Sequence, residues 1–176
     1  EADLRTSLNI FLDNIVWQTA GADFRKLLNS RHLPLNERLA RLYGAQRVLG
    51  GTTIHLGEFG PSFFDHERAG LLTHPYLLAL YSYHNGTSPI HRGVFVTRHV
   101  LGRSLKPPPE AVVFKDEAFA PDMTMREKVT QLTKADACMT CHGIINPLGF
   151  ALEQFDGIGR LRETEKGRPI NTISDY

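Results

Sequence analysis

The sequence predicts a mainly α-helical fold with long ordered loops, and two observations support this prediction. Apolar residues recur at spacings of three and four in several short segments, which is the period of an amphipathic helix. Glycine and proline, at 15 and 10 of the 176 residues, gather between these segments and favour turns there. The sequence contains no internal repeat and no low-complexity tract. We therefore expect one compact module.

Length and composition exclude several classes of function. Hydrophobic residues make up 41% and charged residues 22% of the chain, which is ordinary for a globular protein. The formal net charge of +1 is too balanced for a nucleic-acid partner. No stretch approaches the roughly 18–20 apolar residues that span a bilayer. The chain begins Glu1-Ala2-Asp3, so we expect a mature or excised piece whose export signal was removed or lies outside it.

The N-terminal region, residues 1–105, is predicted to be helical. Apolar residues recur at helical spacing from 4 to 29, and Gly21 divides this run into two helices. Asn36 is a typical N-cap and Gly44 a typical helix stop, so a short helix is expected between them.

Two further helical segments follow a glycine-rich loop, in which Thr52–Leu56 is predicted to be a short strand. Residues 67–83 are again apolar at helical spacing, but Pro75 interrupts them and opens a second short helix. Next, Thr87-Ser88-Pro89 supplies a cap and a first-turn proline for a helix that ends at about Leu101.

The rest of the chain comprises an irregular, Pro-rich connection at 106–122 and a region at 123–176. A helix is predicted from Thr124 to Lys134. Pro147 is expected to open another helix that runs through Phe155. The tail alternates weakly around Lys166-Gly167, which predicts a small C-terminal hairpin.

Both cysteines of the chain lie in one motif, Cys138-Met139-Thr140-Cys141-His142. This Cys-x-x-Cys-His pattern is the attachment sequence of a c-type haem. Two thiols three positions apart on a helical turn can reach the two vinyl groups on one edge of a porphyrin, and the next residue projects its imidazole beneath the iron. We therefore expect one covalent haem c, attached through Cys138 and Cys141, with His142 as the proximal ligand of the iron.

Other uses of the two cysteines stay open. A dithiol redox pair has the same spacing but typically lies beside a βαβ pattern, which the sequence lacks. A structural zinc site would need two more soft ligands, and only histidines without a paired spacing could supply them. A chance match of three residues is the remaining alternative. The context of the motif favours haem over all three.

Several segments on both sides of the motif match, together, the sequence pattern of a known family. They are Asn36-Glu37-Arg38-Leu39-Ala40 with Tyr43-Gly44, Arg68-Ala69-Gly70-Leu71-Leu72-Thr73, His84-Asn85-Gly86-Thr87-Ser88-Pro89 with Arg92-Gly93, Pro107-Pro108-Pro109, and Pro147-Leu148-Gly149-Phe150-Ala151-Leu152-Glu153 with Phe155-Asp156 and Gly159-Arg160. In order and spacing they resemble the haem-bearing domains of planctomycete-type multidomain c-type cytochromes, which are labelled domains of unknown function. The resemblance covers roughly residues 30–165. It implies a cytochrome c-like helical domain with one haem, as part of a longer exported protein.

An apolar run after the motif is expected to line the haem. It consists of Ile144, Ile145, Leu148, Phe150, Leu152 and Phe155, and Pro147 is expected to lie against the haem with them. These side chains would exclude water and raise the reduction potential, although the same pattern also fits the core face of a helix. Arg92, Arg160 and Arg162 are candidate partners of the haem propionates, although a surface arginine usually has no such specific role.

The distal ligand of the iron has several candidates. No Met and no His follows His142, so a Met or His ligand from this chain must lie upstream. We prefer His84, because the Asn85-Gly86 turn and the capped helix after it would hold its backbone in place. Met123 and Met125 are alternatives, as is an open site. A Met ligand gives a higher potential than a second His.

The motif and its flanks together predict a c-type cytochrome module that transfers single electrons between redox partner proteins. Thioether attachment places it outside the cytoplasm, in the periplasm or in a membrane-associated complex. The even charge favours docking through a small local patch. The alternatives are a haem-containing subunit of a larger oxidoreductase with an open distal site, and a structural domain whose haem fills the core. No nucleophile triad, phosphate loop or paired carboxylates in the sequence supports independent catalysis.

Overall fold

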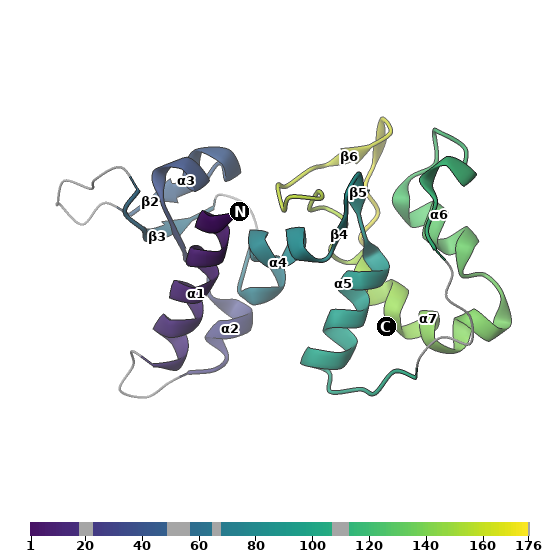
Figure 1. The fold of residues 1–176 in the computed structure, drawn as a ribbon, viewed down its shortest axis with the longest axis horizontal. Helices are drawn as coiled ribbons and strands as arrows, with labels where there is room; N and C mark the ends of the chain where they lie inside the picture. The colour runs from purple at the N-terminus through teal and green to yellow at the C-terminus, as the bar shows by residue number, and fades with distance from the viewer. Residues whose placement is uncertain (18–22, 49–56, 65–67, 107–112, 176) are drawn as a thin grey trace. The chain divides into compact units, whose positions relative to one another are not determined.

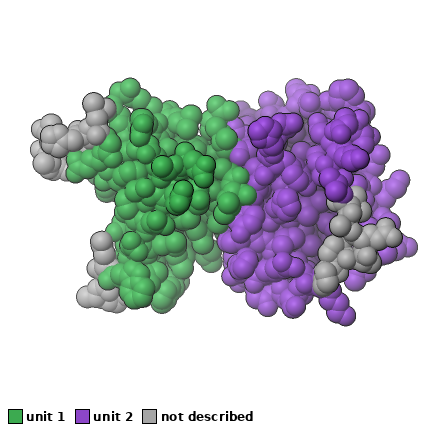
Figure 2. All heavy atoms as spheres, in the orientation of Figure 1, with its two compact units in different colours: residues 1–80, 158–160 green, residues 81–157, 161–176 purple. Residues whose placement is uncertain are grey.

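The computed structural model describes residues 1–17, 23–48, 57–64, 68–106 and 113–175. The predicted strand at Thr52–Leu56 and the run Pro107-Pro108-Pro109 therefore lie outside the described residues. The chain divides into two compact units, residues 1–80 with 158–160 (unit 1) and residues 81–157 with 161–176 (unit 2), which Figure 2 colours separately. This division differs from the predicted regions, because residues 81–105 group with the Cys-x-x-Cys-His region rather than with the N-terminus.

The prediction of a mainly α-helical chain is confirmed (Figure 1). Unit 1 contains the helices α1 (Ala2–Val16), α2 (Lys26–Asn29), α3 (Glu37–Tyr43) and α4 (Pro75–Leu80), the 3-10 turn η1 (Leu71–Thr73), and the strands β1 (Leu33–Leu35), β2 (Gln46–Arg47) and β3 (Gly60–Phe63). Unit 2 contains α5 (Pro89–Phe95), α6 (Met125–Leu132) and α7 (Asp136–Phe150), the π-helical turn η2 (Val96–Val100), the 3-10 turn η3 (Asp116–Ala118), and the hairpins β4 (Ser82–Tyr83)–β5 (Gly86–Thr87) and β6 (Thr164–Glu165)–β7 (Arg168–Pro169). None of the described helices is long and apolar enough to cross a membrane.

Local signals placed several helix ends correctly. The Asn36 side chain accepts a hydrogen bond from the Leu39 N–H at 2.9 Å and caps α3, which ends at Gly44 with φ 66°. Ser88 caps α5 in the same way. Thr124 and Glu127 form a capping box at the start of α6. Each cap satisfies backbone N–H groups that the helix itself leaves without an acceptor.

Unit 1 contains a small sheet that the sequence analysis did not predict. Its strands are antiparallel in the order β1-β3-β2, and Pro34 of β1 lies opposite Pro61 of β3. Two facing prolines, in strands of three and four residues, have the composition of a loop rather than a sheet. The sheet forms because β1 is buried along its whole length against α1. Pro75 opens the short helix α4 as predicted, whereas the described residues just before it form the 3-10 turn η1 instead of a helix.

A buried polar pair lies in unit 1, where the sequence showed no signal for it. His74 is fully buried, its Nδ1 accepts from the Tyr76 N–H at 3.2 Å, and its Nε2 therefore donates to the Ser7 hydroxyl at 3.2 Å. Arg68 is also buried and donates to the carbonyls of Thr73 and Gly159. Burial first, and the Arg68 charge second, lower the pKa of His74 to about 3.

Acid should therefore destabilise the protein through His74. Its pKa is about 3 in the folded chain and 6.5 in the unfolded chain, so the unfolded state binds more protons between these values. The contribution of His74 to the free energy of unfolding is fully present above pH 6.5. It decreases by about 1.4 kcal/mol per pH unit as the pH falls toward 3. Denaturant unfolding at pH 7 and pH 5 checks this. His74→Asn should flatten the dependence, whereas the same change at exposed His32 should not; equal slopes for all three proteins would contradict it.

In unit 2, α5 and α7 pack with their backbones in direct contact at two glycines. A β-carbon on Gly93 of α5 would lie 2.0 Å from the Ile145 carbonyl oxygen of α7. A β-carbon on Gly149 of α7 would lie 1.9 Å from the Pro89 carbonyl oxygen of α5. Real contacts to a β-carbon are far longer, so only glycine permits this approach. The pair of contacts determines where α7 lies on α5.

The course of α7 corrects one prediction. Pro147 does not open a new helix; it lies inside α7, which runs without a break from Asp136 to Phe150. A proline in a helix interior removes one backbone hydrogen bond and disfavours a helical conformation of the residue before it, here Asn146. The side chain of Asn146 is buried and hydrogen-bonded on both sides, which offsets this local cost. The predicted hairpin at the tail is present as β6–β7, with Lys166 and Gly167 at positive φ.

Candidate functional site

The Cys-x-x-Cys-His motif lies on one face of a helix, in the first half of α7. Cys138 and Cys141 are one turn apart, and both are free and half-buried. His142 follows directly and is also half-buried. The two thiols and the imidazole thus meet the spacing that the sequence analysis required of them. Among the described residues, no group of three His, Cys, Asp or Glu side chains gathers that could hold a metal ion by itself.

A chain of hydrogen bonds determines which nitrogen of His142 carries the proton. Its Nδ1 lies 2.9 Å from Asn146 Oδ1, and Asn146 Nδ2 donates to the Thr133 hydroxyl oxygen at 2.8 Å. The Thr133 hydroxyl in turn donates to the Val129 carbonyl at 2.8 Å. The Asn146 oxygen can only accept, so Nδ1 of His142 is the donor. Its Nε2 therefore keeps the lone pair that a metal ligand needs.

A hollow of about 470 Å³ lies beside His142 in unit 2. This volume is within the range of ligand pockets, roughly 300–1,000 Å³. Its walls come from α6, α7 and the C-terminal tail, and comprise Arg126, Thr130, Thr133, Lys134, Met139, His142, Gly143, Asn146, Pro147, Phe150, Ile173 and Asp175. We refer to it as the His142 hollow. Arg126 lies over the Phe150 ring, 4.4 Å from its centre, and donates to the carbonyls of Asn171 and Ile173.

The predicted apolar run divides between this hollow and the rest of the unit. Pro147 and Phe150 line the hollow. Ile144 and Leu148 are half-buried and are not among its lining residues. Phe155 is fully buried in the core. The structure therefore brings His142 together with two of the predicted wall residues, whereas Cys138 and Cys141 are not among the residues that line the hollow.

Arg92 does not lie at a solvent-facing position where a propionate could reach it. Its side chain is 1% exposed. Its guanidinium donates to the backbone carbonyls of Leu152, Phe155 and Asp156 at 2.8–3.0 Å and to the Ser82 hydroxyl at 3.1 Å. The structure corrects the expected role, because the Arg92 side chain hydrogen-bonds the backbone of the segment that follows α7 and holds it in place. Only contacts between distant parts of the sequence could reveal this.

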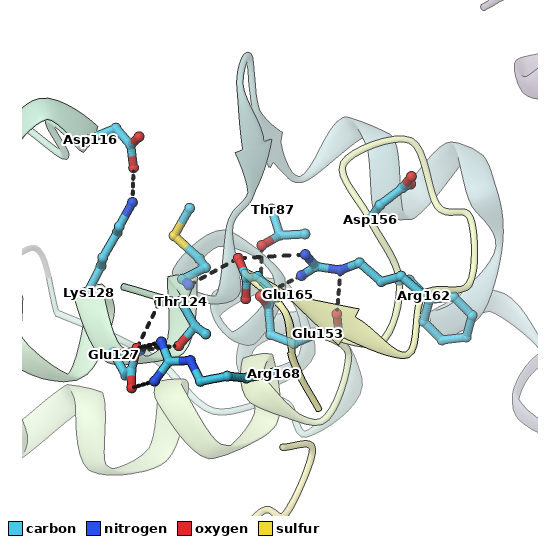
Figure 3. Close-up of polar contacts among 12 residues, drawn as sticks. Thr87, Asp116, Thr124, Glu127, Lys128, Glu153, Asp156, Arg162, Glu165 and Arg168 are labelled. Carbon is cyan, nitrogen blue, oxygen red and sulfur yellow. Dashed lines mark hydrogen bonds and ion pairs between the residues drawn. The ribbon is translucent and has the colours of Figure 1, made fainter. Parts of the chain in front are cut away.

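A buried carboxyl, Glu153, lies beside Arg92. It accepts from the Thr87 hydroxyl at 2.7 Å and from Arg162 at 3.2 Å, as Figure 3 shows, and it lies 3.7 Å from Arg92. Burial raises the pKa of Glu153 to about 7, against the opposing effects of the Thr87 hydrogen bond and the two arginines. Glu153 also contributes to a second hollow, of about 630 Å³, between α6 and the β6–β7 hairpin.

The candidate distal ligands lie in three different settings. His84 is exposed at the tip of the β4–β5 hairpin, which projects away from α7 (Figure 1). Met125 is buried in the core with Val129 and Phe150. Met123 lines the second hollow, which shares Arg126, Thr130 and Lys134 with the His142 hollow. No contact in the described part of the chain brings His84 to His142.

Sequence reasoning missed the polar residues around His142. Asn146 follows His142 by four positions, a spacing that puts two helical side chains side by side, and this signal could have found it. Thr133, Arg126 and Lys134 precede the motif on other elements. Their approach to the hollow depends on how α6 and the tail pack against α7, and no local pattern records it.

Comparison with known proteins gives one family. Residues 68–165 match the family model described as "PSCyt3: Protein of unknown function (DUF1588)". The match spans more than half of the chain and includes α5, α6, α7 and the motif. No curated protein and no solved structure matches the chain.

Proposed function

The chain belongs to the PSCyt3 family of proteins of unknown function (DUF1588), and on that premise we propose that it is a c-type cytochrome module with one covalent haem, which transfers single electrons. One observation carries this proposal. The Cys138 and Cys141 thiols share a helical turn with an imidazole whose Nδ1 proton is engaged and whose Nε2 is available, and this imidazole lines a hollow of ligand size.

The residues present fit a haem. Cys138 and Cys141 would attach it through thioethers, and His142 Nε2 would bind the iron. Pro147 and Phe150 would supply the apolar wall that excludes water. When bound, the group supplies a one-electron couple at its iron.

The cations of the hollow replace Arg92 as the proposed propionate partners. Arg126 and Lys134 both line the His142 hollow, and each carries a charged group that can pair with a carboxylate. Arg92 differs from them because its side chain is only 1% exposed and its guanidinium is surrounded by backbone carbonyls. We therefore assign the neutralisation of the propionate charges to Arg126 and Lys134.

Location and partners follow from the same chemistry. Thioether attachment takes place outside the bacterial cytoplasm, so the module would act in the periplasm or at the outer face of a membrane. Its partners would be redox proteins or further domains of a longer chain. The formal net charge of +1 favours a small docking patch over long-range steering.

Maturation of the chain tests the proposal. The chain, produced with a cytochrome c maturation system, should gain the mass of one haem, give a c-type pyridine haemochrome spectrum and keep its colour after acid–acetone extraction. The double variant Cys138→Ser/Cys141→Ser should lose covalent haem, whereas the neighbouring exposed Thr140→Val should keep it. A colourless wild-type sample with the mass of the bare polypeptide would end the proposal.

Carbon monoxide separates the two cytochrome-like functions. An electron carrier should be low-spin, and its ferrous spectrum should not change under carbon monoxide, because both axial positions are filled. The exposed position of His84 favours the second candidate, an oxidoreductase subunit with an open distal site. A ferrous form that binds carbon monoxide would support that function instead.

A further inference from the structure

We propose that Asn146 and Thr133 are positioning residues, which hold His142 as its Nδ1–H tautomer and thereby set the reduction potential of the iron that it would bind. This inference rests on the proposed function. It concerns two residues outside the motif, one on α7 and one after the end of α6. We refer to the three side chains, with the Val129 carbonyl at their end, as the Val129–His142 relay.

The direction of every hydrogen bond in the relay is determined. The Thr133 hydroxyl has one proton, and that proton goes to the Val129 carbonyl four residues earlier, at 2.8 Å. The oxygen of Thr133 must then accept from the amide NH₂ of Asn146, at 2.8 Å. This leaves the amide oxygen of Asn146 facing His142 Nδ1 at 2.9 Å. An amide oxygen carries no proton, so the imidazole must donate.

Burial makes the relay difficult to replace with water. Asn146 is 5% exposed and Thr133 is 3% exposed. A buried polar group that loses its partner costs more free energy than the bond itself contributed. The relay also links the last turn of α6 to the middle of α7, so it fixes the ring of His142 relative to both helices.

The nature of the acceptor determines the electronic effect. A hydrogen bond from Nδ1–H to an oxygen raises the basicity of Nε2 and increases its donation to a metal. Stronger donation stabilises ferric over ferrous iron and lowers the potential. The acceptor here is a neutral amide, which withdraws the proton less than a carboxylate would. The relay thus holds the potential at an intermediate level, below that of an imidazole without an acceptor.

Midpoint potentials of matured variants test this effect. Asn146→Leu removes the acceptor and should raise the ratio of reduced to oxidised protein at a fixed potential by roughly tenfold, or 59 mV for a one-electron couple. Thr133→Val removes the acceptor of the Asn146 amide. It should therefore also raise the ratio of reduced to oxidised protein, but by less than Asn146→Leu does. Thr133→Ser keeps the hydroxyl and should restore the wild-type value. The control Thr140→Val removes an exposed hydroxyl that also bonds the carbonyl four residues earlier, and should not change the ratio.

The tautomer can be measured without haem, which separates this inference from the proposed function. In the reduced, metal-free chain, ¹⁵N shifts of the His142 ring should show the proton on Nδ1 for the wild type, Thr133→Ser and Thr140→Val. Asn146→Leu should move the proton toward Nε2. Haem-bearing variants with unchanged potentials, or a wild-type ring with its proton on Nε2, would overturn the relay. A chain that shows the Nδ1–H tautomer but takes up no haem would refute the proposed function and support the positioning of His142.

Discussion

Gly149→Ala is expected to lower the free energy of unfolding of unit 2 by about 3 kcal/mol or more. The added β-carbon would lie 1.9 Å from the Pro89 carbonyl oxygen and 2.6 Å from its carbonyl carbon. Both atoms belong to the backbone of α5, so no side-chain rotation relieves the overlap. One of the two helices must move, and α5 and α7 form the main helix contact of the unit. Denaturant unfolding followed by circular dichroism measures the loss.

Two further glycines make this test specific. Gly93→Ala places a β-carbon 2.0 Å from the Ile145 carbonyl oxygen and should cost a similar amount. Gly143→Ala lies on the same helix as Gly149, but its β-carbon would meet only the Met139 side chain, at 4.0 Å. That change should stabilise α7 by about 0.5–1 kcal/mol, since alanine favours a helix over glycine. Equal stabilities of Gly149→Ala and Gly143→Ala would show that the two helices do not pack backbone to backbone.

Arg92→Met should be as damaging, with a loss of about 3–5 kcal/mol. The variant keeps the first part of the aliphatic stem but removes the guanidinium, which donates to three backbone carbonyls and lies 3.7 Å from Glu153. These groups are buried, so water does not readily replace the guanidinium. Thermal and denaturant unfolding of the matched variants give the size of the effect.

Two substitutions serve as controls. One makes the same Arg-to-Met change at the surface, and the other keeps the positive charge at position 92. Arg168→Met removes an ion pair with Glu127 at the surface and should change the stability little. Arg92→Lys keeps the charge but not the planar set of donors, so it should recover only part of the loss. If Arg92→Lys were fully stable and shifted only the potential of the matured protein, Arg92 would be a propionate partner after all.

Local structure was predictable from the sequence wherever a short-range signal decided it. Asn36, Ser88 and Thr124 each cap the helix that was expected after them, because a cap involves only the next three residues. The Lys166-Gly167 turn closes the predicted hairpin for a similar reason. The same local reasoning failed at Pro147, because the buried contacts of Asn146 outweigh the tendency of a proline to start a helix.

The sequence alone determined the motif: two thiols and an imidazole at positions that one helical turn brings onto a shared face, whatever surrounds them. The tertiary structure decided what surrounds them. It assigned Arg92 to carbonyls about 60 residues away, placed His84 at an exposed hairpin tip, and joined Thr133 to His142 through Asn146. The physical reason is burial. A polar side chain that loses contact with water must find its partners among whatever groups the packing of helices brings close, and that packing depends on contacts between distant parts of the chain.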